Sequence, residues 1–262
     1  MQALHTAATG MAAQELNVQV ISNNIANLRT TGFKKQTASF QDLIYEHVRR
    51  VGAQSSDQGT ILPVGIDIGG GVKTVGTPRL MSQGTLAQTG NDLDIAIRGE
   101  GFFKIQMPDG TYAYTRDGSF QMDATGRVVN AQGNPVQPTI TIPQNASGIT
   151  INAQGQVTVT LPGSTTPTTV GQIGLTRFIN KAGLQPNGDN LFTDTPASGT
   201  PQDGIASADG FGDMQQSNLE QANVEVVSEI SDLIAAQRAY EVNSKVITAT
   251  DQMLQSTSQM LR

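Results

Sequence analysis

The chain has 262 residues, a formal net charge of −6, 15% charged residues and no cysteine. An acidic chain of this composition lacks the basic surface that binding to DNA or RNA requires, so we expect no nucleic-acid partner. The absence of cysteine excludes disulfide bonds and thiolate metal ligands. No stretch approaches the ~20 apolar residues of a membrane-spanning helix, and the N-terminus lacks the basic segment and apolar core of a signal peptide. We therefore expect no membrane insertion, and either a cytoplasmic protein or export without a cleaved signal peptide.

The N-terminal part of the chain predicts a helix with a heptad repeat. Apolar residues recur every seven positions, and a second heptad position is apolar as well, which is typical of the a/d seam of a coiled coil. The seam residues are Leu4, Met11, Val18 and Ile25 in the first position, with Ala7, Ile21 and Leu28 in the second.

The stretch SNNIANLRTTGFKK, residues 22–35, predicts the end of this helix. Asn and Gly are poor residues for a helix interior and are typical of helix exits and left-handed turns. Phe33 could fold back onto the last helical turn, and the basic pair Lys34-Lys35 is expected to be solvated. The predicted exit residues are Ser22, Asn23, Asn24, Asn27, Gly32 and Phe33.

Two segments of different character follow the helix exit. FQDLIYEHVRR, residues 40–50, predicts a continuation of helical structure. Residues 52–73, GAQSSDQGTILPVGIDIGGGVK, predict an extended, glycine-rich arm, because they hold too few large apolar residues to form a core. The residues that we assign to this arm are Gly52, Gln54, Pro63, Gly65 and Gly71.

The middle of the chain predicts a meander of short antiparallel strands. Glycine turns such as Asp109-Gly110 and Asp117-Gly118 recur at close intervals and separate short alternating or aromatic runs. ITINAQGQVTVTL predicts a hairpin around Gln154-Gly155, and GEGFF predicts a tight bend before a buried aromatic pair. Residues 185–213 predict irregular loops with short strands.

The C-terminal stretch, residues 217–262, contains no proline or glycine and predicts a long helix. Its heptad seam is longer than that of the N-terminal helix, so about half of it has no partner within the chain. Exposure of that stripe is unfavourable, at about 1.5–3 kcal/mol per large side chain. We therefore expect a second copy of the chain to cover it. The seam comprises Leu219, Val226, Leu233, Tyr240, Ile247, Leu254 and Leu261.

No group of residues predicts catalysis, a metal or a cofactor. Neither histidine, His5 nor His47, has a partner at metal-motif spacing, and Asp92 and Asp94 are more typical of a turn than of paired catalytic carboxylates. The residues alone thus predict an α+β fold that is not an enzyme, in which the N- and C-terminal helices pair as a coiled coil and a central antiparallel β-domain is inserted between them. Two alternatives remain at this point, a β-domain enzyme such as a glycosidase and a surface adhesin.

Three stretches resemble the flagellar axial proteins, the family that forms the bacterial rod and hook. SNNIANLRTTGFKK resembles their N-terminal signature and AQRAYEVNSKVITATDQML, residues 236–254, their C-terminal signature. The stretch from DLDIAIRG to GRVV, residues 92–129, is similar to their shared β-domain. The resemblance implies an inner coiled-coil layer formed by residues 1–45 and 217–262, an arm at residues 46–75, and an outer β-domain at residues 76–216.

The resemblance also implies the function and the partners. The length argues against the hook protein, and the arm is similar to a segment typical of the distal part of the rod, with the proximal rod paralogues as the alternative. We expect a structural subunit that polymerises helically into a rigid hollow drive shaft and transmits torque from motor to hook. The implied partners are sister copies, proximal rod proteins, the hook protein, the P- and L-ring proteins and the flagellar type III export apparatus. The implied location is the basal body, where the rod crosses the periplasm.

Overall fold

The computed structural model describes residues 2–52, 64–163 and 166–260 of the chain. It has a helix near each end and a middle made of short antiparallel strands, so the predicted α+β class is confirmed. Residue contacts divide the chain into two compact units. The helix unit comprises Met1–Ile25, Gln36–Pro78 and Glu225–Arg262, and the β-unit comprises Ala26–Lys35 and Arg79–Val224.

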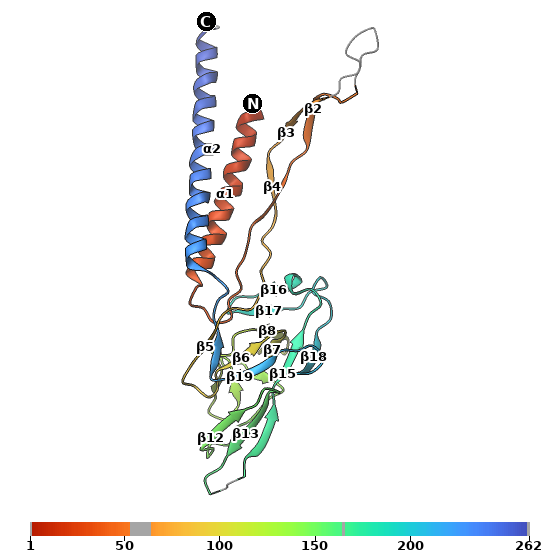
Figure 1. Ribbon diagram of the computed structural model, residues 1–262, viewed down its shortest axis with the longest axis vertical. Coiled ribbons are helices and arrows are strands. Elements are labelled where there is room, and N and C mark those ends of the chain that lie inside the picture. Colours follow the sequence, from red (N-terminus) through yellow and green to blue (C-terminus); the bar gives the residue numbers. More distant parts are fainter. Residues whose placement is uncertain (1, 53–63, 164–165, 261–262) are drawn as a thin grey trace. The chain divides into compact units, whose positions relative to one another are not determined.

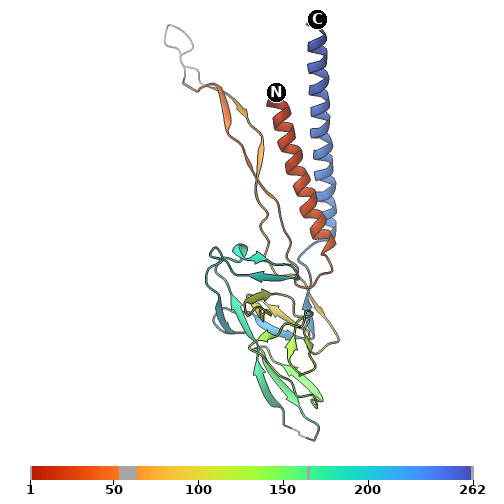
Figure 2. The same cartoon turned by 180° about the vertical axis from the view of Figure 1, so that it is seen from behind.

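The helix unit contains the two long helices of the described chain. α1 (Gln2–Ala26) ends inside the asparagine-rich segment, as predicted. α2 (Val226–Met260) has 35 residues and is about 52 Å long at 1.5 Å per residue. The two helices run side by side in opposite directions in both views (Figures 1 and 2). Within the described ranges, neither helix is long and apolar enough to cross a membrane.

The start of α2 corrects the prediction of one helix over residues 217–262. Residues before Val226 form β20 (Asn218–Glu220), which pairs antiparallel with β5 (Leu86–Gln88) and places Leu219 opposite Ala87. Leu219 is therefore a strand residue and does not belong to the helical seam. Leu28 likewise lies beyond the end of α1. Pairing with a distant strand overrides the local heptad pattern at Leu219, because the ladder satisfies backbone groups that a helix end would leave open.

The helix unit also contains a two-stranded ribbon, which corrects the helix predicted for residues 40–50. β1 (Ser39–Asp42) pairs with β4 (Val72–Gly76), and β2 (Tyr45–Arg49) pairs with β3 (Ile66–Gly69), both antiparallel. The segment is extended because partner strands from residues 66–76 satisfy its backbone hydrogen bonds, information that local sequence does not carry. The described part of the predicted extended arm forms the returning side of this ribbon.

The β-unit is built around a seven-stranded sheet, as counted over the described residues. A three-stranded sheet and several two-stranded pairs accompany it. In spatial order the large sheet runs β16 (Gln185–Pro186), β17 (Leu191–Thr193), β8 (Tyr112–Thr115), β7 (Phe102–Gln106), β15 (Gly174–Arg177) and β18 (Gln202–Ile205), and β11 (Val136–Gln137) also pairs with β7. The smaller sheets are β12 (Gly148–Ile151) with β13 (Gln156–Thr160) and β14 (Thr168–Gln172), β6 (Ile95–Arg98) with β19 (Asp213–Gln216), β9 (Gln121–Met122) with β10 (Val128–Val129), and β5 with β20.

The strand pattern of the β-unit agrees with the sequence prediction. The hairpin around Gln154-Gly155 has Ile149 opposite Val159 and Ile151 opposite Val157. The predicted bend at GEGFF occurs at Gly99 and Gly101, whose φ angles are 109° and 141°. It leads directly into Phe102 and Phe103, which are fully buried.

The core of the β-unit forms from the inward faces of these strands. A large, mostly aliphatic cluster includes Ile105 and the Phe103 ring from β7, and a second, aromatic cluster lies around Phe102. In the aromatic cluster the ring of Tyr114 meets Phe178 edge-on at 4.7 Å between centroids. Edge-to-face pairs of this kind are favourable beyond the area that they bury. The β-unit is therefore a folded body with its own core, onto which the segment 26–35 is built.

Candidate assembly surfaces and the Glu220 cluster

The titratable residues considered as reactive groups lie in ordinary structural contacts. Asp94 accepts a hydrogen bond from Asn91 Nδ2 at 3.0 Å in the turn before β6. His47 Nδ1 lies 2.6 Å from Asp67 Oδ1 on the ribbon, and both side chains are largely exposed. Within the described ranges, no three His, Cys, Asp or Glu side chains gather where they could hold a metal ion. The features that stand out are instead contacts between distant parts of the chain and exposed apolar stripes.

Asn24 joins three segments of the helix unit. Its side-chain Nδ2 donates to the Gln36 carbonyl at 2.8 Å, and its Oδ1 accepts from the Gln36 amide at 2.9 Å. The same Nδ2 donates to Glu229 Oε2 on α2 at 3.1 Å. Asn24 and Glu229 are each only 1% exposed. The asparagine that the sequence assigned to the helix exit thus also ties α1 to α2, because a side-chain amide can donate and accept at once.

Gly32 sets the path of the segment that follows α1. Its φ is +68°, a left-handed value that favours glycine, and its amide donates to the Glu220 carbonyl at 2.7 Å. A Cβ atom at Gly32 would lie 2.7 Å from the Asp117 nitrogen, so a side chain does not fit there. Phe33, next in the chain, is buried, with the Arg79 guanidinium 5.7 Å from its ring centroid.

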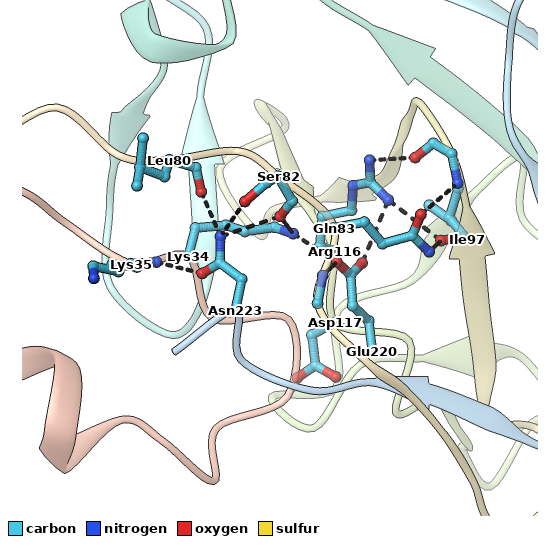
Figure 3. Close-up of polar contacts among 12 residues, drawn as sticks. Lys34, Lys35, Leu80, Ser82, Gln83, Ile97, Arg116, Asp117, Glu220 and Asn223 are labelled. Atoms are coloured by element: carbon cyan, nitrogen blue, oxygen red, sulfur yellow. Dashed lines mark hydrogen bonds and ion pairs between the residues drawn. The ribbon is translucent and has the colours of Figure 1, made fainter. Parts of the chain in front are cut away.

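The Glu220 cluster, defined as Lys34, Arg116, Glu220 and Asn223, lies inside the β-unit (Figure 3). Lys34 Nζ donates to Glu220 Oε1 at 2.6 Å and to the Ser82 carbonyl at 2.8 Å. Arg116 Nη1 lies 3.4 Å from Glu220 Oε2, and its Nη2 donates to the Gly99 carbonyl at 2.6 Å. The three charged side chains are at most 3% exposed. Glu220 is therefore a buried carboxylate between two buried cations.

Burial is the main influence on the two cations of this cluster. It lowers the pKa of Lys34 and of Arg116, and the negative charge of Glu220 acts in the opposite direction on both. Their charged forms depend on Glu220 because both side chains are buried. The expectation that Lys34 is solvated is therefore wrong for this residue.

Asn223 adds uncharged contacts to the same cluster. Its Oδ1 accepts from the Lys35 amide at 2.7 Å. Its Nδ2 donates to the Leu80 carbonyl at 2.8 Å and to the Ser82 carbonyl at 3.1 Å (Figure 3). Three segments of the β-unit, residues 26–35, 79–85 and 217–224, thus meet at this cluster.

The predicted seam residues occupy different environments. On α1, Ile21 is buried, whereas Leu4, Met11, Val18 and Ile25 are half-buried. On α2, Leu233 and Ile247 are half-buried, and every residue from 251 to 260 is exposed. Leu261 lies outside the described residues. The exposed apolar residues of α2 are Val226, Val227, Ile230, Ile234, Tyr240, Val242, Val246, Met253, Leu254 and Met260.

The predicted arm residues lie on the ribbon where they are described. Gly71 has a φ of 115° and approaches α1 so closely that an added Cβ would meet Thr9 Oγ1. Gly65 lies against the Arg49 carbonyl across the ribbon, and Gly52 is exposed. Gln54 and Pro63 fall outside the described residues. The ribbon also exposes large apolar side chains, namely Ile44, Val48, Val51, Val64, Ile66 and Ile68.

The sequence missed most of the Glu220 cluster. Lys34 and Glu220 are 186 positions apart, so no local pattern connects them. Arg116 and Asn223 stand in stretches that were assigned to a strand meander and to a helix. The one available signal was the isolated glutamate in NLEQAN, an ionisable residue beside apolar neighbours, and it does not indicate a partner.

Comparison with known proteins matches three stretches of the chain to models of flagellar protein families. Residues 4–34 match the flagella basal body rod protein family, residues 96–159 the flagellar hook protein FlgE/F/G D1 domain, and residues 215–260 the flagellar basal body rod FlgEFG protein C-terminal family. The flagellar basal-body rod protein FlgG of Caulobacter vibrioides is 54% identical over 260 residues, covering 99% of each chain. The proteins of the same name from Agrobacterium fabrum and Bacillus subtilis are 47% and 35% identical over the full length of both chains. The chain therefore belongs to the family of flagellar basal-body rod proteins, and it is a structural subunit of the rod rather than an enzyme.

Proposed function

We propose that this chain is a subunit of the distal rod that polymerises helically into a rigid hollow shaft and transmits torque from the motor to the hook. In this proposal α1 and α2, within residues 1–45 and 217–262, supply the inner layer, residues 46–75 an arm between subunits, and the β-unit, which includes residues 26–35 and 217–224, the outer layer. The family membership supports a polymer of the basal body. The finer assignments rest on surfaces of the chain itself.

The observation that carries the proposal is the unpartnered apolar stripe on the C-terminal half of α2. Leu254 is 46%, Met253 60% and Met260 81% exposed. Large apolar side chains gain about 1.5–3 kcal/mol each on full burial. A neighbouring copy is the natural partner, because a head-to-tail contact that does not close on itself produces a filament.

The proposed coiled-coil pairing of α1 and α2 has support from contacts between them. Asn24 donates to Glu229 near one end of the pair. Further along, a Cβ atom at Gly10 would lie 2.9 Å from Asn243 Nδ2, so glycine allows a close approach there. A helix that pairs on one face within the chain and keeps a second apolar face free suits a layered polymer.

The ribbon is the proposed inter-subunit arm. It exposes Ile44 at 90% and Val64 at 74%, which is unusual for a two-stranded ribbon that stands alone in water. Burial of these residues between neighbouring subunits would stiffen the shaft, because each arm would then tie one subunit to another.

The partners follow from the place of the subunit in the shaft. Sister copies form the lateral contacts, and proximal rod proteins and the hook protein adjoin the two ends of the distal segment. The P- and L-ring proteins surround the shaft, and the flagellar type III export apparatus delivers the chain. The absence of cysteine suits passage of an unfolded chain through a narrow channel.

Electron microscopy of concentrated purified protein tests the proposal. We expect hollow tubes of uniform width that form above a threshold concentration. A protein that stays monomeric at every concentration, or that forms only amorphous aggregates, would contradict the proposal.

A further inference from the structure

The chain passes between the helix unit and the β-unit at four points, after residues 25, 35, 78 and 224. The β-unit segments next to these points are 26–35, 79–85 and 217–224. These segments are the covalent connections of the β-unit to the helix unit, so force that passes between the two units along the chain enters or leaves the β-unit through them.

All three segments are tied together by the Glu220 cluster. Lys34 and Lys35, at the end of the first segment, bind Glu220 and Asn223 of the third. Ser82 of the second segment accepts from both Lys34 and Asn223 through its carbonyl. Arg79 and Leu80 bind the first segment as well, through the Lys34 and Lys35 carbonyls at 3.2 and 2.8 Å.

Further contacts fix the first segment lengthwise on the β-unit. Thr31 Oγ1 donates to Asp117 Oδ1 at 2.9 Å, and Asn190 Nδ2 donates to the Thr31 carbonyl at 3.0 Å. The Gly32 amide binds the Glu220 carbonyl. Each of these bonds has one specific partner, so a slip of one residue would break all of them at once.

We propose that the Glu220 cluster is the anchor through which force enters the β-unit. This inference rests on the proposed role of the chain in a torque-transmitting shaft. Apolar surfaces slide past one another with little change in contact, whereas a charged hydrogen bond is directional and is lost on a shift of 1–2 Å. Burial adds to the resistance, because a displaced Lys34 or Arg116 would leave a buried charge without its partner.

Single-molecule pulling on the full chain tests the anchor. The chain has no cysteine, so Ala26→Cys and Glu225→Cys introduce two unique and exposed attachment points. Pulling between them loads the first and third segments against each other across the cluster, in parallel with the Asn24–Glu229 contact between α1 and α2, which the variants below leave unchanged. We expect a distinct first rupture in this background, before the β-unit unfolds.

Three variants distinguish the anchor from general stability. Glu220→Gln removes the counter-charge, and under a given load we expect first rupture on the order of a hundredfold faster. Asn223→Ala removes only neutral bonds and should accelerate it on the order of tenfold. Asp203→Asn is the control, because it breaks the Lys104–Asp203 ion pair, which has the same length of 2.6 Å but is partly exposed and lies outside the three segments. Rupture of this variant should match the parent.

The outcomes separate the anchor from the proposed function. Unchanged rupture in Asn223→Ala together with unchanged rupture in Glu220→Gln would overturn the anchor, as would an equal acceleration in Asp203→Asn. If Glu220→Gln does not fold, Asn223→Ala against Asp203→Asn decides the question. The measurement uses single chains, so a failure to form tubes would count against the shaft without affecting this result.

Discussion

Glu220 forms ion pairs with two buried cations, so changes within its cluster have unequal consequences. Glu220→Gln leaves Lys34 and Arg116 without a counter-charge and should lower the free energy of unfolding by about 3–5 kcal/mol. Lys34→Met leaves the Arg116–Glu220 pair in place and should lower it by only about 1–2 kcal/mol. Denaturant unfolding of the purified chain measures both values. Equal losses of unfolding free energy in the two variants would contradict the role of Glu220 as the counter-charge of both cations.

Tyr114 gives the β-unit a defined pH dependence. Burial, with a smaller contribution from the charges of Asp194 and Asp203, raises its pKa from 10.0 to about 12. Between these values the unfolded chain loses the phenolic proton while the folded chain keeps it, so stability falls as pH rises. The slope approaches ~1.4 kcal/mol per pH unit for one proton.

The variant Tyr114→Phe isolates this effect, because it keeps the ring that meets Phe178. We expect wild type to lose stability relative to the variant steadily above about pH 10, as measured by denaturant unfolding at a series of pH values. A difference that does not change with pH would show that Tyr114 ionises alike in both states.

For single residues, the sequence predicted local roles but not contacts with distant parts of the chain. Asn24 was identified as a helix-exit residue from the local properties of asparagine, and α1 ends at Ala26. Its bond to Glu229 was not predictable, because the two residues are 205 positions apart. The prediction that Lys34 is solvated was wrong for the same reason, because its partner Glu220 is 186 positions away in the sequence.

At the scale of elements, the spacing of hydrophobic residues predicted those helices and strands whose contacts lie close together in the sequence. Both terminal helices and the hairpin of β12 and β13 agree with their patterns. The pattern failed at residues 40–50 and at Leu219, where pairing with a distant strand decides the conformation. β-structure depends on such partners more strongly than helix does.

The C-terminal end of α2 carries the next prediction. Leu254→Asp should leave the unfolding free energy of the monomer within about 0.5 kcal/mol, because exposed substitutions away from special contacts have small effects. It should abolish tube formation, because it places a charge in the proposed inter-subunit seam. Gln252→Asp is the matched control: it adds the same charge to an exposed residue of the same helix outside the heptad seam, and assembly should survive. Light scattering against concentration compares the three proteins, and normal assembly of Leu254→Asp would exclude the seam.

The ribbon carries a prediction about stiffness. Removal of residues 52–73 deletes β3 and the start of β4 and with them the arm. If the arm ties neighbouring subunits, tubes of this variant should be curved or more flexible, with a shorter persistence length in electron micrographs. Straight tubes of unchanged stiffness would show that the arm has another role.

At the scale of the whole molecule, the sequence was most informative through its two ends. Two heptad stripes separated by a long β-rich insert predicted the α+β fold, and three signature stretches indicated the family that the relatives confirm. The way in which one chain contacts the next is a property of several copies. A single sequence shows only the surfaces that remain to be covered, such as the α2 stripe and the ribbon.

The central claim is that the two ends of the chain pack against each other and against sister copies to form the wall of a tube. Helical reconstruction of assembled tubes by cryo-electron microscopy at side-chain resolution tests it most directly. We expect α1 and α2 in the innermost layer, with Met253 and Leu254 buried against neighbouring subunits and the β-unit outside. A reconstruction in which α2 stays exposed to solvent, or in which the β-unit alone makes the inter-subunit contacts, would contradict the account.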